Sequence, residues 1–113
     1  MISFKPTVRF DTNPENLAML HAVCQAYQEL GLHATITSAN DSMSSLRVPN
    51  TRHALNWAFD VSVSGVPEHL IHACVNGIQR RLGGDYQTIF EAKLDNKSVT
   101  IRWPHIHVEF DPH

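Results

Sequence analysis

The stretch that decides the fold is Trp57-Ala58-Phe59-Asp60-Val61-Ser62-Val63. Its odd-numbered residues are large and apolar and share one face of an extended chain, while Ala58, Asp60 and Ser62 share the other. Strict alternation of this kind predicts a strand with one face packed on a core. Asp60 is either an acid on a solvated sheet face or a group held by a partner, because burying a carboxylate alone is costly.

Two helices are predicted, one on each side of this strand in the sequence. Asn13-Pro14-Glu15 supplies a cap residue, a proline at the first helical position and an acid in the first turn. This pattern predicts a helix from about residue 14 to 30, ended by Gly31. A second helix is expected from Pro67 to residue 82, ended by Gly83-Gly84.

The remaining segments predict strands and one long loop. Alternation and β-branched residues indicate strands at 33–38, 86–94, 98–103 and 105–110, with a hairpin turn at 95–97. Residues 39–52 are rich in Ser, Asn and Asp and predict an irregular surface loop. The expected fold is therefore α+β, with two helices packed on one face of a small, mostly antiparallel sheet.

Length and composition fit one globular domain spanning residues 1–113. The net charge of −2 and the scattered basic residues argue against nucleic acid as a partner. No apolar run is long enough to span a membrane. Residues 1–5 lack the pattern of a secretory signal, so we expect synthesis in the cytoplasm, with export by another route left open. We expect a monomer.

The cysteines and the histidines of the chain predict different roles. Cys24 and Cys74 lie within apolar helical patterns, which favours two buried thiols over a disulfide or metal thiolates. Eight histidines in so short a chain direct attention to metal chemistry or proton transfer. A second metal at His69 and His72, neighbours on one helix face, is the less favoured interpretation.

The last expected strand carries the clearest grouping of polar residues. In Pro104-His105-Ile106-His107-Val108-Glu109-Phe110, the apolar residues share one face and His105, His107 and Glu109 share the other. Two imidazoles on one strand face can converge on one ion or substrate. Taken alone, this pattern also fits an exposed polar face.

A second grouping lies upstream, where His53 precedes Asp60 by seven residues at the end of the polar loop. If the Asp60 strand lies beside the His107 strand, the polar faces bring His53, Asp60 and His107 to one point. Three nitrogen and oxygen ligands with a fourth position open to water are typical of a catalytic zinc site.

Together these motifs resemble the zinc D-alanyl-D-alanine metallopeptidases, a family that includes peptidoglycan carboxypeptidases, dipeptidases and phage L-alanyl-D-glutamate endolysins and that is structurally related to the hedgehog domain. His53, Ala58 and Asp60 match the family's His-x-x-Gly-x-Ala-x-Asp motif, and Trp103 to His107 is similar to its later His-x-His motif. The resemblance runs from about residue 17 to 112. It departs from the family at Asn56, which stands where the family has glycine.

The resemblance implies a role for each candidate residue. It makes His53, Asp60 and His107 the zinc ligands of a peptidase that cleaves peptide bonds in peptidoglycan stems or crosslinks. His105 is the first candidate for general base or transition-state partner, Glu91 is the second and Glu109 the third. Many relatives place an arginine in the loop upstream of the motif. Here residues 38–41 contain no arginine, so the substrate-binding candidates are Arg47, Arg52 and Trp103.

Two other functions remain open from the sequence. A catalytically inactive, zinc-binding or structural (phage-related) protein can keep the same fold and ligands. Two histidines and a carboxylate also suit the iron(II) of a non-haem oxygenase. Those enzymes usually carry His-x-Asp on one strand, so the spacing of seven residues favours zinc.

Overall fold

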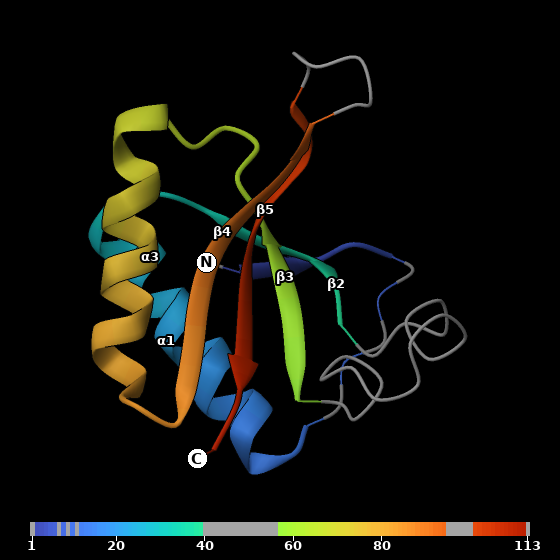
Figure 1. Cartoon of the computed structure of the whole chain (residues 1–113), viewed down its shortest axis with the longest axis vertical. Coiled ribbons are helices and arrows are strands. Elements are labelled where there is room, and N and C mark those ends of the chain that lie inside the picture. Colours follow the sequence, from blue (N-terminus) through green and yellow to red (C-terminus); the bar gives the residue numbers. More distant parts are fainter. Residues whose placement is uncertain are drawn as a thin grey trace.

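The structure is a computed structural model that describes residues 2–6, 8, 10, 12–39, 57–94 and 101–112, with the backbone alone for 92–94 and 101–103. Five strands and two helices are described (Figure 1). In chain order they are β1 (Ile2–Phe4), α1 (Pro14–Glu29), β2 (Ala34–Ser38), β3 (Ala58–Ser62), α3 (Glu68–Leu82), β4 (Tyr86–Leu94) and β5 (Ile101–Phe110).

The strands form one sheet in the order β1-β2-β3-β5-β4. All neighbours are antiparallel except β1 and β2, which run parallel, so the sheet is mixed. Strand β5 follows the other strands in the chain yet lies inside the sheet, between β3 and β4 (Figure 1). The α+β class is confirmed. Strand β1 was not predicted, because its three residues carry no alternation long enough to detect.

The separate strands predicted at 98–103 and 105–110 are wrong, because β5 runs unbroken through Pro104. Proline lacks the N–H that a ladder needs, so it is tolerated in sheets only at edges or irregularities. Here the β4–β5 register shifts between Glu91 and Lys93, whose partners are His105 and Arg102. Two residues of β5 therefore oppose one of β4, as in a β-bulge. The pairing of β5 with β3 also ends at His105, so Pro104 has no partner there.

The helices begin and end close to where the sequence predicted. At the start of α1, the side chain of Asn13 accepts a hydrogen bond from the backbone N–H of Asn16 at 2.7 Å. Gly31 follows the helix with a φ of +72°, and Gly83 follows α3 with a φ of +88°. Side chains with a Cβ rarely adopt this region, so glycine ends both helices at low cost.

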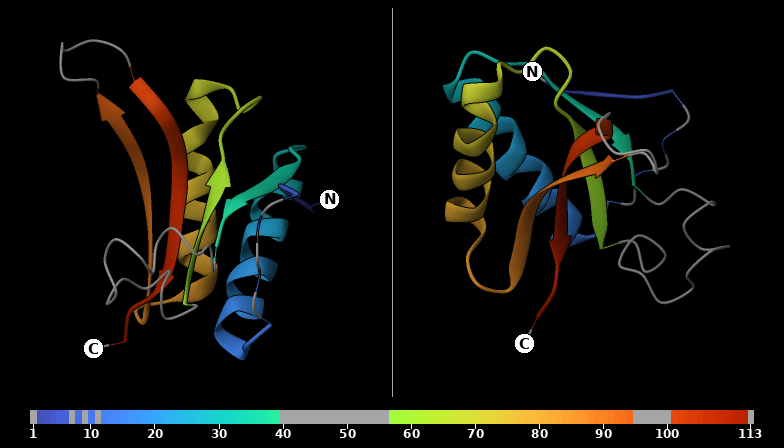
Figure 2. Two further views of the ribbon diagram at one scale, coloured as in Figure 1. Left: turned by 90° about the vertical axis from the view of Figure 1, so that its right-hand side faces the viewer. Right: turned by 45° about the horizontal axis from the view of Figure 1, so that its top comes forward.

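The core lies between the two helices and one face of the sheet (Figure 2). Phe59, Val61, Ile106 and Val108 are fully buried on the helix side of β3 and β5. Tyr27 of α1 reaches across the core, and its hydroxyl donates to the backbone oxygen of Ser62 at 3.0 Å. Burial of the ring raises the pKa of Tyr27, as does the nearby Cys74. The opposite face of β3 and β5 is thereby left for polar side chains.

The structure also bears on the predictions for the cysteines and for membrane spans. Both cysteines are free thiols: Cys74 is buried and Cys24 is partly buried. Among the described residues, no helix is both long and apolar enough to cross a membrane.

Candidate metal centre

The pairing of β3 with β5 sets the centre of the candidate site. Asp60 and His107 are direct partners in this antiparallel ladder, and Ser62 and His105 are the next pair on the same face. Directly opposed residues have Cβ atoms about 5 Å apart, so side chains of this length meet. The helix-facing neighbours are the fully buried Val61 and Ile106. Packing of the apolar face therefore holds the polar face in register.

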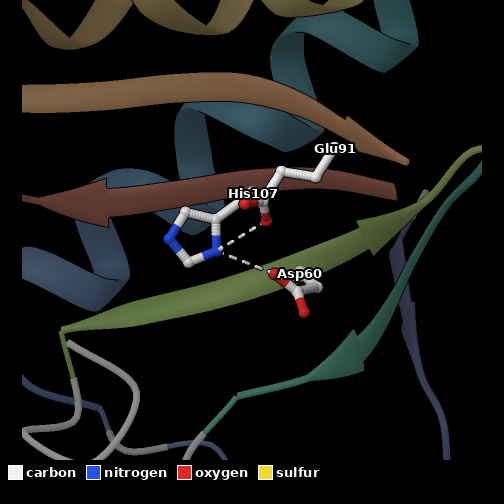
Figure 3. A group of neighbouring side chains, drawn as sticks. All are labelled: Asp60, Glu91 and His107. Carbon is white, nitrogen blue, oxygen red and sulfur yellow. Dashed lines mark hydrogen bonds and ion pairs between the residues drawn. The ribbon is translucent and has the colours of Figure 1, made fainter. Parts of the chain in front are cut away.

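Three side chains converge at this point (Figure 3). The Nδ1 atom of His107 lies 2.9 Å from Oδ1 of Asp60 and 3.8 Å from Oε1 of Glu91. One ligand atom from each of the three residues lies within 4.8 Å of the other two. A nitrogen and two carboxylate oxygens at this spacing could hold a metal ion, and zinc accepts such a donor set.

His105 and Glu91 form a second pair beside the first. They face each other across β5 and β4, and Nε2 of His105 lies 2.9 Å from Oε1 of Glu91. The same nitrogen is 3.6 Å from Oδ1 of Asp60. The two histidines therefore share the two carboxylates, and the four groups form one cluster.

Burial separates the members of this cluster. The side chains of His107 and Asp60 are 12% and 17% exposed, whereas that of Glu91 is 47% exposed. Asp60 and His107 are thus fixed within the sheet surface, and Glu91 reaches solvent. A third carboxylate, Glu109, lies next to His107 on β5, with its Oε1 2.7 Å from Nε2 of His107.

These carboxylates control the charge of His107. Burial by itself lowers the pKa of the ring, but hydrogen bonds to Asp60 and Glu109 and the charges of Asp60 and Glu91 outweigh that effect. The pKa of His107 is raised to about 9. In the metal-free protein at neutral pH the ring is therefore an imidazolium that donates from both nitrogens. A metal ion must displace one of these protons to bind.

The predicted site residues have different outcomes. Asp60, His107, His105 and Glu91 are brought together. The side chain of Trp103 is not among those that the structure describes, although its backbone belongs to β5. His53, Arg47 and Arg52 lie outside the described residues. The structure thus describes two of the three predicted zinc ligands, Asp60 and His107.

The sequence did not predict that Glu91 lies within ligand distance of His107. Alternation along 86–94 and along 105–110 places Glu91 and the two histidines on definite faces. It does not give the register between the two strands. That register depends on the β-bulge in β5 at Pro104, which has no clear sequence signal.

A hollow among the described residues lies elsewhere. It measures about 610 Å³ and is lined by Glu68, His69, Ile71, His72 and Phe90, between the start of α3 and β4. Its histidines do not belong to any group of three metal-ligating residues that the structure describes. We therefore place the candidate site by its chemistry, on the opposite side of the sheet from α3, and not by the size of a cavity.

Comparison with known proteins adds no relative. No family model matches the sequence, and searches of curated proteins and of solved structures find no match either.

Proposed function

We propose that the chain is a zinc-dependent hydrolase that cleaves peptide bonds of peptidoglycan stems or crosslinks, as a phage endolysin-type endopeptidase does. The zinc ligands in this proposal are His53, Asp60 and His107. The observation that carries it is the direct pairing of Asp60 with His107 on β3 and β5, with His105 and Glu91 beside them. The resemblance of the motifs to the D-alanyl-D-alanine metallopeptidases supplies the reaction and the substrate class.

In this proposal, bound zinc would acidify a water molecule and polarise the scissile carbonyl. Glu91 acts as the general base that accepts the proton and returns it to the leaving amine. Its exposure of 47% lets it exchange protons with substrate and solvent. His105 holds the carboxylate of Glu91 at 2.9 Å and directs it toward the reacting atoms.

Glu91 also lies close enough to serve as a ligand. We assign it the role of base because it is the most exposed of the three carboxylates in contact with the two histidines. Zinc ligands are held by packing and by hydrogen bonds from neighbouring groups, and Asp60 and His107 fit that description. The variant Glu91→Gln distinguishes the roles, because a base is needed for cleavage alone and a ligand is needed for zinc binding.

Native mass spectrometry of the purified protein tests the metal site first. We expect one zinc ion in the parent protein, none in Asp60→Ala, and one in Glu91→Gln. The exposed pair His69→Gln and His72→Gln on α3 serves as a control and should retain the zinc. A parent protein that binds no zinc after zinc is added would refute the site and the peptidase function together.

Cleavage of purified muropeptides tests the reaction. We expect cleavage products whose formation EDTA abolishes and added zinc restores. For Glu91→Gln we expect kcat to fall by about 100- to 10,000-fold, the range typical of the loss of a general base.

A second function is favoured by one departure from the family. No arginine stands in residues 38–41, where many relatives use one to bind a substrate carboxylate. A zinc-binding protein without hydrolytic activity fits that loss. Folded, zinc-loaded protein that cleaves none of a panel of stem and crosslinked muropeptides would select this second function.

A further inference from the structure

We infer that Glu109 is a positioning residue that fixes His107 with Nδ1 as its metal-binding nitrogen. This inference rests on the proposed metal site and adds to it a residue, a tautomer and a direction of approach. Glu109 would not touch the metal or the substrate. It would act through the imidazole ring of His107.

The geometry places the two sides of the imidazole ring in different surroundings. On one side, Nδ1 of His107 faces Oδ1 of Asp60 at 2.9 Å and Oε1 of Glu91 at 3.8 Å. On the other side, Nε2 faces Oε1 of Glu109 at 2.7 Å. The two carboxylate oxygens of the candidate metal group therefore lie on the Nδ1 side of the ring, whereas Nε2 faces Glu109.

The strand itself explains why Glu109 lies on the Nε2 side. Residues two apart on β5 share a face, and the fully buried Ile106 and Val108 hold that face outward. The side chains of His107 and Glu109 are only 12% and 18% exposed, so the contact is sheltered from bulk water.

The chemistry follows from the two forms of a neutral imidazole. One ring nitrogen carries the proton and the other carries the lone pair that binds a metal. Carboxylates face both ring nitrogens, so when a metal ion displaces the proton from Nδ1, the carboxylate of Glu109 keeps the remaining proton on Nε2. Partners of this kind also raise the basicity of the ligand and prevent rotation of the ring, and their removal typically weakens metal affinity about 10–100-fold.

Zinc affinity, measured by competition with a chelator, is the first test. We expect Glu109→Ala to bind zinc about 10–100-fold more weakly than the parent protein. Glu109→Gln keeps an oxygen that can accept from Nε2 and should recover part of that loss. Glu68→Gln removes the same charge at the exposed start of α3 and serves as the matched control, with unchanged affinity expected. Backbone amide spectra verify that each variant is folded.

Nitrogen-15 NMR of the histidine rings gives a readout that a merely structural role would not change. In the zinc-loaded protein we expect Nδ1 of His107 to show the signature of a coordinated nitrogen and Nε2 to keep its proton. Coordination through Nε2, or parent-like affinity in folded Glu109→Ala, would overturn the inference while leaving the zinc site intact. A parent protein that binds no zinc would overturn both, and zinc bound through Nδ1 without muropeptide cleavage would refute hydrolysis alone.

Discussion

The pH dependence of stability in the metal-free protein should reveal the charge of His107. The pKa of this ring is raised from 6.5 to about 9 in the folded chain. Because the folded-state value lies above the unfolded one, the charged ring stabilises the fold fully below pH 6.5. That contribution disappears as the pH rises through 9. At about 1.4 kcal/mol per pH unit, the difference corresponds to roughly 3 kcal/mol.

The assay is unfolding by urea or heat in EDTA at intervals from pH 6 to pH 10. For a domain of this size, roughly 3 kcal/mol corresponds to a fall of about 10–15 °C in Tm. His107→Gln lacks the titrating group, so its stability should change much less over the same range. The difference between the two curves removes contributions from every other group that titrates in both proteins.

Two controls test whether the pH dependence of stability comes from His107 itself. His72→Gln replaces an exposed histidine on α3 and should follow the parent curve. Direct NMR titration of the ring of His107 reports its pKa even if His107→Gln is too unstable to measure. Parallel curves for the parent protein and His107→Gln, together with a ring that titrates near pH 6.5, would show that the neighbouring carboxylates do not raise the pKa of His107.

Three further substitutions test the fold that supports the site. Tyr27→Phe removes the hydrogen bond to the backbone oxygen of Ser62, a partly buried acceptor, so we expect a loss of about 1 kcal/mol by urea unfolding; an unchanged midpoint would contradict this role. Gly83→Ala, at a φ of +88° and a ψ of −172°, should lower stability by about 1–3 kcal/mol in the same assay, because residues with a Cβ rarely adopt this conformation. Gly84→Ala, whose added Cβ would have nothing within 4 Å, should not; equal losses would argue against the conformational explanation. Phe59→Ala empties a fully buried position of β3 and should cost about 3–5 kcal/mol, and a loss below about 1 kcal/mol would mean that the core is not packed there.

The sequence was sufficient to predict the faces of the strands and most of the elements. Alternation along 57–63 and 105–110 placed Asp60, His105 and His107 on polar faces, because a strand turns by half a revolution at each residue. The cap at Asn13 and the glycines at 31 and 83 predicted the helix ends for reasons of backbone chemistry that act locally.

What the sequence did not predict depends on contacts between distant segments. The register that puts Asp60 opposite His107 joins residues 47 positions apart, and no local pattern encodes it. Pro104 misled the prediction of strand ends because the bulge in β5 allows the strand to continue through a residue that lacks a backbone N–H. The convergence of Glu91 on His107 follows from the same bulge and so became visible only in three dimensions.

The position of β5 has a consequence for how the protein is made. A ribosome completes β3 and β4 before it reaches β5, yet these two strands have no contact in the sheet except through β5. Until residues 101–110 emerge, Asp60 and Glu91 belong to strands that nothing holds side by side. Domains otherwise tend to fold from the amino-terminal end during synthesis. Here β3 and β4 can join one sheet only after β5 has been made, so Asp60 and Glu91 come together later than the packing of α1 on α3 or of β2 on β3 requires.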